Sequence, residues 1–290
     1  MRCAVIGAKG YIGKHIVFYL KQNGHYVESY DVIDCNEEGY VKCDLTCKDD
    51  ISRMNLDVDY LFMFAGLTGT HVGFDKYDTF LDVNERGLLN LLDTIRHSTF
   101  RPKIIYPSTR LVYKGADHPL KENDDKETKT IYAVNKLASE GLLYAYNKSF
   151  DIPFTIFRIC VPFGNMLSDD YSFGTVGFFI RQARDDKRIT LYGDGSIKRT
   201  FTSMHDLCYQ IVEGGFKPES DNQIFNVGGV IYSLKDTASL IASHYHAKVV
   251  FTPFPDKDLK IESGSTYFDS SGIEKILVNV EYTDLNSLLN

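Results

Sequence analysis

The sequence predicts an α/β fold in which helices cover both faces of a doubly wound parallel sheet, followed by a smaller C-terminal lobe. Two observations support this prediction. Over residues 1–160, short apolar runs alternate with helical patterns, as they do when both faces of a parallel sheet are covered. After Gly164 the loops lengthen, and glycines and aromatic residues increase. We therefore expect one domain over residues 1–160 and a lobe over residues 161–290, with the chain crossing between them.

The expected elements follow from these patterns in chain order. Strands separated by helical segments predict βαβ units and a parallel sheet. In the large domain the predicted strands are Arg2–Ile6, Tyr26–Tyr30, Tyr40–Cys43, Tyr60–Ala65, Lys103–Tyr106 and Phe154–Ile159, and the predicted helices are Gly10–Gln22, Ser52–Asn55, Phe80–Ser98 and Ile131–Ser149. In the lobe we expect a strand at Lys187–Tyr192 that ends in a glycine turn at 193–195, and helices at Met204–Gly214 and Leu234–His246.

Composition excludes several classes of protein. A net charge of −7 argues against a nucleic-acid or membrane-surface binder, because such proteins present a basic face. No apolar stretch approaches the roughly 18 residues of a membrane span, and no signal peptide fits before the strand that begins near Cys3. Six cysteines in 290 residues are too few for a secreted disulfide framework. Cys43 and Cys47 lack the further ligands of a metal site, so we expect a cytoplasmic protein without metal.

A glycine-rich segment between the first predicted strand and helix indicates a nucleotide site. Its spacing is GxxGxxG, and it lies within a βαβ unit. Glycines there let the backbone turn tightly and let a pyrophosphate approach the free N–H groups of the helix N-terminus. This context predicts a Rossmann-type dinucleotide-binding domain, whose cofactor contacts in this segment are Gly7, Lys9, Gly10, Tyr11, Ile12 and Gly13.

Asp31, at the end of the second predicted strand, indicates which dinucleotide binds. A carboxylate at this place bonds the ribose hydroxyls of NAD and repels the 2′-phosphate of NADP. Lys9 could assist a phosphate but does not outweigh this carboxylate. Asp44, after the third strand, is either an adenine contact or a turn residue. The sequence therefore favours NAD.

Tyr132 and Lys136 have the spacing of an acid–base pair on one helix face. The reference pKa of a tyrosine is about 10. A nearby ammonium favours the phenolate and so lowers this pKa. Tyr144 and Lys148 match the same spacing, but they lie about 18 Å further along the helix, so both pairs cannot serve one site. Only Tyr132 follows a hydroxyl-bearing strand end, at Thr109. We interpret Tyr144 as a helix-surface or core aromatic residue.

Motifs that span nearly the whole chain resemble one family when they are taken together. They are GAKGYIG at residues 7–13, Asp31, FAG at 64–66, DVNERGLLNLL at 82–92, PSTRLVYKG at 107–115, YAVNKLASE at 132–140, FRICVPFG at 157–164, LYGDGSIKRTF at 191–201 and FDSSGIEKIL at 268–277. In this order they resemble the extended short-chain dehydrogenase/reductase family, in its NAD-dependent nucleotide-sugar epimerase/dehydratase group.

The resemblance implies roles for individual residues. Thr109 takes the place of the catalytic Ser/Thr, although a turn after a strand is its alternative role. Tyr132 takes the place of the acid and base, and Lys136 of the residue that holds Tyr132 and the nicotinamide ribose. The implied cofactor set adds Asp44, Leu45, Ala65, Gly66 and, in a supporting role, Asn84. The implied substrate contacts are Thr68, Arg110, Asn165 and Arg199, the last as a clamp on a nucleoside diphosphate.

Two departures from the family pattern bear on the reaction and the substrate. The 4,6-dehydratases of the family carry an Asp-Glu pair directly after the threonine, where this chain has Arg110 and Leu111, which supply neither an acid nor a base. Decarboxylating relatives also place an acid near this point, so both reactions are disfavoured. Where relatives have RxxN, this chain has Val161 in place of the asparagine. Asn165 is the residue that could compensate.

Three functions remain open. The leading hypothesis is an NAD-dependent nucleotide-sugar epimerase that removes and returns a hydride at a sugar carbinol, expected to be C4. The alternative is an NAD(P)H-dependent reductase of a 4-keto-6-deoxy nucleotide sugar, favoured by the short chain and by Lys9. A third is a non-catalytic NAD-binding sensor or scaffold. The helices Phe80–Ser98 and Ile131–Ser149 match those that pair in dimeric relatives, so we expect a homodimer whose substrate is a nucleotide-diphosphate sugar.

Overall fold

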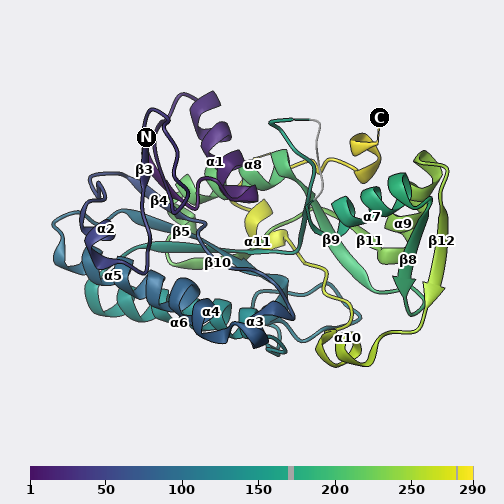
Figure 1. Cartoon of the computed structure of the whole chain (residues 1–290). Helices are drawn as coiled ribbons and strands as arrows, with labels where there is room; N and C mark the ends of the chain where they lie inside the picture. Colours follow the sequence, from purple (N-terminus) through teal and green to yellow (C-terminus); the bar gives the residue numbers. More distant parts are fainter. Residues whose placement is uncertain (169–172, 279, 290) are drawn as a thin grey trace.

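A parallel sheet forms the larger lobe of the computed structural model, which describes residues 1–168, 173–278 and 280–289 (Figure 1). Within these residues its seven strands follow the order β10-β6-β5-β4-β1-β2-β3. Their bounds are Arg2–Ile6 (β1), Tyr26–Asp31 (β2), Tyr40–Lys42 (β3), Tyr60–Met63 (β4), Lys103–Thr109 (β5), Phe154–Ile159 (β6) and Gln223–Asn226 (β10). The direction of strand order changes between β1 and β4, which is where sheets of this kind bind ligands. The doubly wound sheet predicted from the sequence is confirmed.

Helices cover both faces of this sheet: α1 (Tyr11–Gln22) and α8 (Met204–Phe216) lie on one face, and α2 (Lys48–Ser52), α5 (Gly87–His97) and α6 (Ile131–Phe150) on the other. Along β1, Cys3 and Val5 belong to the core on the α1 side. Ala4 and Ile6 belong to the core on the α5 side. Because both faces are buried, the strands need apolar residues at successive positions, and this is the pattern that the sequence displays.

The helix expected at Phe80–Ser98 is present but is not uniform. It consists of α4 (Tyr77–Leu81), a π-helical turn η1 (Asp82–Arg86) and then α5, and the short helix α3 (Val72–Asp75) precedes it. π-turns inside helices are uncommon and often occur at functional sites. The helix expected at Ser52–Asn55 is misplaced, since α2 begins at Lys48, and Asp49 and Asp50 occupy its first turn, where carboxylates favour a helix N-terminus.

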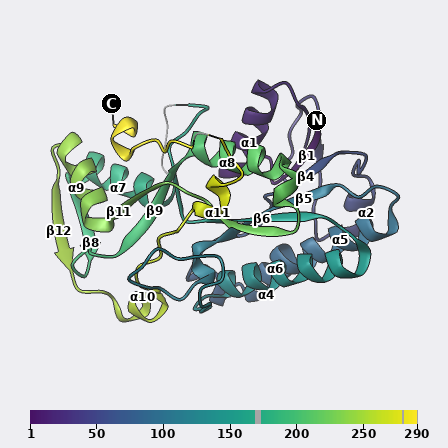
Figure 2. The same cartoon turned by 180° about the vertical axis from the view of Figure 1, so that it is seen from behind.

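The smaller lobe is built on two short sheets (Figure 2). One has the order β11-β9-β7 and the other pairs β12 with β8. Its elements are Val161–Phe163 (β7), Gly174–Asp185 (α7), Arg188–Tyr192 (β8), Lys198–Ser203 (β9), Val230–Ser233 (β11), Leu234–His244 (α9), Lys248–Thr252 (β12) and Asp256–Ile261 (α10). The strand expected at Lys187–Tyr192 is therefore β8, and the expected helices at 204–214 and 234–246 are α8 and α9. The lobe has its own apolar core, between α7, α9 and the strands.

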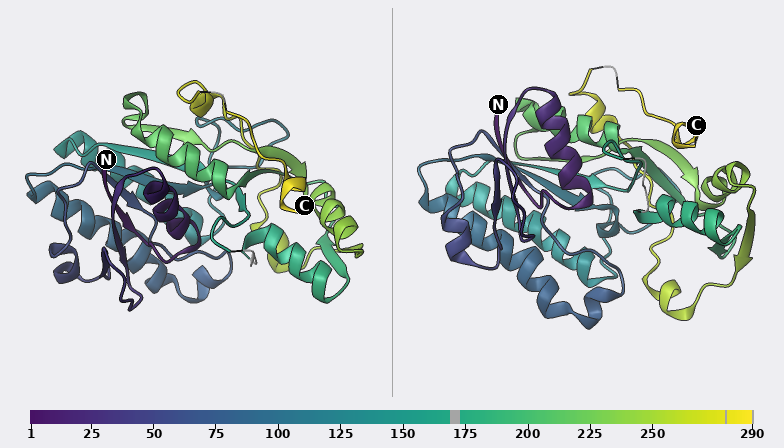
Figure 3. Two further views of the ribbon diagram at one scale, coloured as in Figure 1. Left: turned by 90° about the horizontal axis from the view of Figure 1, so that it is seen from above. Right: turned by 45° about the horizontal axis from the view of Figure 1, so that its top comes forward.

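The chain passes repeatedly between the two lobes, as the views in Figure 3 show. After β7, α7, β8 and β9 it returns to the large sheet for α8 and β10, and α11 (Ser271–Glu274) also packs there. Short 3-10 turns complete the described elements, at Arg110–Val112 (η2), Pro218–Ser220 (η3) and Leu285–Leu288 (η4). The division into residues 1–160 and 161–290 as functional domains stays a prediction. No helix within the described ranges is long and apolar enough to cross a membrane.

Candidate active site

Two adjoining cavities open at the carboxyl ends of the parallel strands. The first, which we name the β2 cavity, has a volume of about 600 Å³ and is lined by Ile6, Gly7, Lys9, Gly10, Asp31–Ile33, Cys43–Thr46, Phe64–Leu67, Thr79, Asp82 and Val83. The second, the β5 cavity, has a volume of about 370 Å³ and is lined by Gly10–Gly13, Phe64, Gly66, Thr68, Pro107–Thr109, Tyr132, Lys136, Ile159, Cys160, Pro162 and Phe173. Gly10, Phe64 and Gly66 line both cavities. An extended ligand could therefore occupy both.

The glycine segment is shaped by close backbone packing. Gly7 has φ +82°, and a Cβ there would lie 2.4 Å from the Ala65 nitrogen. A Cβ on Gly13 would lie 2.0 Å from the Gly7 carbonyl oxygen. No side chain caps the N-terminus of α1, and its first turn holds no acidic residue. The uncapped N–H groups there suit an anionic group such as a pyrophosphate, and the cofactor contacts expected for this segment stay a prediction.

Asp31 lies at the end of β2 and lines the β2 cavity. Its Oδ2 accepts a hydrogen bond of 2.8 Å from the Lys9 backbone N–H, so the carboxylate also fixes the glycine segment. The Lys9 ammonium lies 2.6 Å from Glu37 Oε1. That hydrogen bond raises the pKa of Lys9 and lowers the pKa of Glu37. Lys9 is therefore already paired with a carboxylate, which weakens the case for its binding a phosphate.

The other predicted cofactor contacts divide into cavity-lining and supporting residues. Asp44, Leu45, Ala65 and Gly66 line the β2 cavity. Asp44 Oδ1 also accepts from the backbone N–H and the hydroxyl of Thr46, as a turn residue does.

Asn84 is buried in the π-turn η1 and lies outside the lining of both cavities. Its amide accepts from the Leu67 N–H at 2.7 Å and donates to the Leu67 carbonyl at 3.1 Å. Asn84 therefore holds the loop that follows β4, and this loop forms part of the wall of both cavities.

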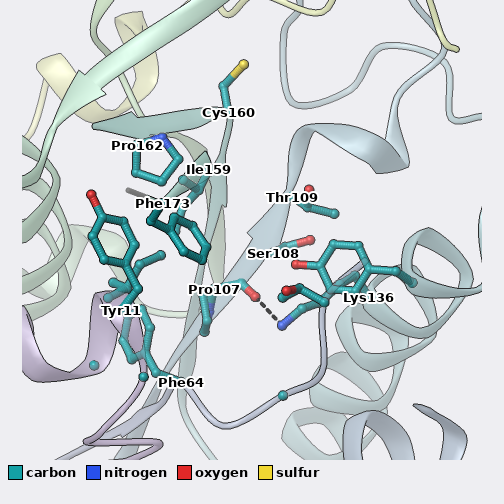
Figure 4. A pocket seen from close by; sticks show the side chains of 16 residues that line it. Tyr11, Phe64, Pro107, Ser108, Thr109, Lys136, Ile159, Cys160, Pro162 and Phe173 are labelled. Carbon is teal, nitrogen blue, oxygen red and sulfur yellow. Dashed lines mark hydrogen bonds between the residues drawn. The ribbon is translucent and has the colours of Figure 1, made fainter. Parts of the chain in front are cut away.

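Thr109, Tyr132 and Lys136 meet in the β5 cavity. Burial raises the pKa of Tyr132 to about 12, while a hydrogen bond with Thr109 opposes that shift. Thr109 Oγ1 also accepts from the Leu111 N–H at 3.3 Å, as a turn residue does, and its catalytic role stays a prediction. The Lys136 ammonium donates to the Pro107 carbonyl at 2.7 Å (Figure 4). Burial lowers the pKa of Lys136 to about 7, and Glu140 opposes this.

Lys136 makes the stability of the folded protein depend on pH. Its pKa is about 7 in the fold and 10.5 ordinarily. Between these values the unfolded chain binds the proton and the folded chain does not, so the free energy of unfolding rises with pH. A Lys136→Met variant lacks this contribution. Urea unfolding between about pH 7 and about pH 9.5 should show wild type gaining stability relative to the variant as pH rises, and a constant difference would contradict the buried, neutral lysine.

A buried polar network supports this trio, and sequence reasoning did not find it. Ser108, which lines the β5 cavity, donates to Glu140 Oε1 at 2.5 Å. Glu140 also accepts from Arg158 at 3.0 and 2.6 Å. Arg158 in turn donates to the Tyr113 hydroxyl at 2.8 Å. The available signal was the position of Glu140, four residues after Lys136 and so on the same helix face.

The predicted substrate contacts are not all brought together. Thr68 lines the β5 cavity. Arg110 and Arg199 lie outside the lining of both cavities, and the Arg199 guanidinium pairs with Glu262 at 2.8 Å. Asn165 also lies outside, where its Oδ1 is 2.8 Å from His15 Nε2 and accepts from the Leu167 N–H. Val161 is buried in the core of the smaller lobe.

The chemistry of the β5 cavity lining is restricted. Tyr11 and Phe173 stack with ring centroids 4.2 Å apart and form an aromatic side opposite the polar side that carries Ser108, Thr109 and Lys136 (Figure 4). Among the described residues, the lining contains no aspartate, glutamate or histidine. Its groups able to move a proton are therefore hydroxyls, the Lys136 ammonium and the Cys160 thiol, and burial raises the pKa of Cys160.

Comparison with known proteins identifies the family. Residues 3–228 match the family described as "NAD dependent epimerase/dehydratase family". The chain belongs to this family. The matched residues include all those that line the two cavities, and the match leaves out the last part of the chain, residues 229–290. It confirms the resemblance inferred from the motifs.

Curated relatives of the chain differ in the activity that their names give. An uncharacterized UDP-glucose epimerase of Bacillus subtilis is 27% identical and covers 96% of this chain and 92% of its own length. A UDP-N-acetyl-alpha-D-glucosaminuronate decarboxylase of Bacillus cytotoxicus is 25% identical over 87% of this chain and 84% of its own. A UDP-glucuronate 4-epimerase of Thermodesulfobacterium geofontis is 26% identical over 73% and 64%. The family thus includes more than one reaction.

Solved structures confirm the fold. A UDP-glucuronic acid 4-epimerase from Bacillus cereus, solved with UDP-glucuronic acid and NAD, superposes with a TM-score of 0.85 at 23% identity, covering 100% of this chain and 96% of that one. A Thermus thermophilus UDP-glucose 4-epimerase in complex with NAD gives a TM-score of 0.81 at 22% identity over 95% and 92%. At these identities the likeness concerns the fold.

Proposed function

We propose that this protein is an NAD-dependent nucleotide-sugar epimerase that inverts a sugar carbinol, at C4. The observation that carries this proposal is the β5 cavity, where Thr109, Tyr132 and Lys136 converge in a lining whose described residues include no carboxylate or imidazole. Such a set can take a proton from a hydroxyl and return it. Elimination of water needs a further acid and base, and Arg110 and Leu111 stand at the place next to Thr109 where dehydratases carry them.

The lining of the β2 cavity suits an NAD molecule that extends into the adjoining β5 cavity. The packing around Gly7 excludes a side chain, Asp31 is suited to the ribose hydroxyls, and the α1 N-terminus is uncapped. When bound, NAD supplies the hydride acceptor and donor. The Tyr132 phenolate takes the proton of the carbinol hydroxyl, and Thr109 donates a hydrogen bond to the same oxygen. The protonated form of Lys136, which its pKa of about 7 leaves partly populated near neutral pH, donates to the Pro107 carbonyl and favours the phenolate through its positive charge.

The epimerised sugar then regains the proton from Tyr132 on the same oxygen. Inversion would require the bound cofactor to return hydride to the opposite face of the carbon, so the sugar would have to change its presentation in the β5 cavity between the two proton transfers. The cavity lining is largely apolar apart from the Ser108–Thr109 side, which limits competing contacts with water. The network from Ser108 through Glu140 to Arg158 holds the helix that carries Tyr132 and Lys136 against β5.

The competing reactions are less well supported. The reductase hypothesis drew on Lys9, which the salt bridge to Glu37 occupies. The decarboxylase named among the relatives is a reason to test carbon dioxide release directly. Names of relatives support a UDP-linked sugar and, for the glucuronate 4-epimerase, reaction at C4.

A product survey tests the proposal. The protein, with catalytic NAD, is incubated separately with each member of three C4 pairs, UDP-glucose and UDP-galactose, UDP-glucuronate and UDP-galacturonate, and UDP-N-acetylglucosamine and UDP-N-acetylgalactosamine, and products are identified by NMR. We expect one pair of C4 epimers to reach the same equilibrium from either side, with no net change in NADH. A sugar that has lost water or carbon dioxide, or a requirement for stoichiometric NADPH, would contradict the proposal.

We also propose a homodimer and a cytoplasmic location. Exposed apolar side chains gather on α4 and α6, which pack together: Tyr77, Leu81, Val134 and Tyr144. This surface lies on the helices that we expect to pair between two copies of the chain. The cytoplasm suits the cysteines, which are free thiols and would stay reduced there.

A further inference from the structure

Lys136 is buried on α6, and two oxygen atoms of β5 hold its Nζ. The Pro107 carbonyl accepts from Nζ at 2.7 Å, and the Tyr106 hydroxyl accepts from it at 3.3 Å. Nζ also lies over the Tyr106 ring, 4.4 Å from its centre. An ammonium over an aromatic ring is favoured over a neutral amine, because the face of the ring carries negative charge. Tyr106 therefore favours the charged form of Lys136 through its oxygen and through its ring.

The hydrogen bonds around Tyr106 fix the direction of each proton. Tyr106 is buried and is hydrogen-bonded to Ser139 as well as to Lys136. Ser139 donates its own proton to the Asn84 carbonyl at 3.2 Å, so the bond between Tyr106 and Ser139 uses the proton of Tyr106. The Tyr106 oxygen is therefore an acceptor toward Lys136. Burial raises the pKa of Tyr106 far above its usual value, so this residue stays a neutral phenol when the protein is at work.

The charged groups around Lys136 leave this role to Tyr106. Glu140, one turn along α6, favours the ammonium, but its carboxylate pairs with Arg158 of β6 at 2.6 Å. Glu85, on the π-turn η1, raises the pKa of Tyr106 and so helps to keep its hydroxyl protonated. Within the described chain, no charged residue on the other elements that contact α6 shifts the pKa of Lys136. Neutral groups of β5 are therefore the close partners of this lysine.

We propose that Tyr106 is a positioning residue for the reaction, whose ring and oxygen keep Lys136 charged beside the base Tyr132. This inference rests on the proposed epimerase function and adds a residue to it. Tyr106 lies outside the lining of both cavities, so it acts through Lys136, whose Nζ is 5.9 Å from the Tyr132 ring centre. Replacing Tyr106 should leave Lys136 bound to the Pro107 carbonyl but should lower the pKa of Lys136, and with it the fraction of Tyr132 that can act as a phenolate.

Unfolding in urea tests this contact without any substrate. Purified wild type and Tyr106→Phe are unfolded at about pH 5.5 and at about pH 9.5. The pKa of Lys136 in the fold is about 7, so Lys136 is protonated at the lower pH and neutral at the higher. Loss of a charged hydrogen bond should lower this pKa by about one unit. We therefore expect Tyr106→Phe to raise the unfolding constant by about five- to tenfold more at the lower pH than at the higher.

Tyr30 supplies a matched control for this variant. It is buried in the same apolar core as Tyr106, but its hydroxyl bonds to Glu28 and to the Asn55 N–H. Tyr30→Phe should lose the same stability at both pH values. In a Lys136→Met background the pH-dependent part of the Tyr106→Phe loss should vanish. A Tyr106→Phe loss that is equal at both pH values, or that keeps its pH dependence without Lys136, would make Tyr106 a packing residue and overturn the inference.

The pH profile of turnover tests the role in the reaction, with the sugar pair that the product survey identifies. Turnover needs the charge of Lys136, so it falls as pH rises through the pKa of that group. Tyr106→Phe should move this descending limb by about one unit to lower pH and change the KM for the nucleotide sugar by less than about threefold. Tyr106→Leu, which also removes the ring, should move the limb further, and Tyr30→Phe should leave it in place.

The two experiments separate this inference from the epimerase proposal. If unfolding shows the expected pH dependence but no nucleotide sugar turns over, the effect of Tyr106 on Lys136 stands and the epimerase fails. If a sugar pair is epimerised but Tyr106→Phe leaves the descending limb in place, the epimerase stands and the inference is wrong. An equal loss of turnover at every pH would also contradict the inference, because a residue needed only for packing gives that result.

Discussion

Turnover by a Tyr132→Phe variant is expected to fall by about 100- to 10,000-fold, the usual contribution of a positioned acid–base group. Phenylalanine keeps the ring in the β5 cavity but removes the hydroxyl that exchanges the proton with the sugar. The pKa of Tyr132 is raised to about 12 by burial, so catalysis requires positive charge nearby to form the phenolate. Steady-state kinetics measure the fall in turnover. A titration of NAD binding should show that the affinity for NAD changes by less than about tenfold.

The chain supplies a matched control for this variant. Tyr144 and Lys148 repeat the spacing of Tyr132 and Lys136 on the same helix, with Lys148 Nζ 5.4 Å from the Tyr144 ring centre. Tyr144 is 54% exposed, so Tyr144→Phe should leave turnover unchanged. Equal losses in the two variants, or full activity in Tyr132→Phe, would refute the assigned role of Tyr132.

Replacing Gly7 by alanine is expected to destabilise the protein by about 2–5 kcal/mol and to abolish NAD binding. The new Cβ would lie 2.4 Å from the Ala65 nitrogen, in a residue held at φ +82°. The left-handed backbone accounts for about 1–2 kcal/mol, and the forced overlap adds about 1–3 kcal/mol. Because the clash is with the backbone of the loop after β4, relief moves the wall shared by both cavities. Urea unfolding and an NAD titration measure the two losses.

A substitution at Gly24 is the control that separates the cost of the left-handed backbone from the cost of steric overlap. It has φ +74°, but a Cβ there meets nothing within 4 Å. Gly24→Ala should therefore show only the backbone contribution of about 1–2 kcal/mol, with NAD binding retained. If the two variants lose the same stability and both still bind NAD, the packing of Gly7 against Ala65 has no role in the cofactor site.

The sequence predicted the features that depend on local pattern. Residues 2–6 and 154–159 were placed as strands with the observed bounds, because buried parallel strands are continuous apolar runs. β5 was predicted to end at Tyr106 yet continues to Thr109, pairing Pro107 with Phe157. Proline normally indicates the end of a strand, and this continuation is what presents the Pro107 carbonyl to Lys136.

The parts of the site that were missed depend on tertiary contacts. The pairing of Arg199 with Glu262, 63 residues away, was not foreseen, and the contact of Arg199 with a diphosphate stays a prediction. Nothing in the local sequence around either residue indicates that pairing. Likewise the buried partner of Glu140 is Arg158 on β6, brought there by the alignment of β6 with β5. The sequence predicted a regular helix around Asn84, where the structure has a π-helical turn. Such a turn contains one residue more than an α-helical turn, and the periodicity of apolar residues does not reveal this insertion.

The fate of a deuterium label at C4 of the substrate tests the central claim most directly. The protein is incubated with a C4-deuterated nucleotide hexose or hexuronate and a trace of NAD, and the product is examined by NMR and mass spectrometry. We expect the C4 epimer with deuterium kept at C4, no loss of mass and no accumulated NADH. Deuterium lost from C4, or a product lighter by water or carbon dioxide, would contradict hydride removal and return at a single carbinol.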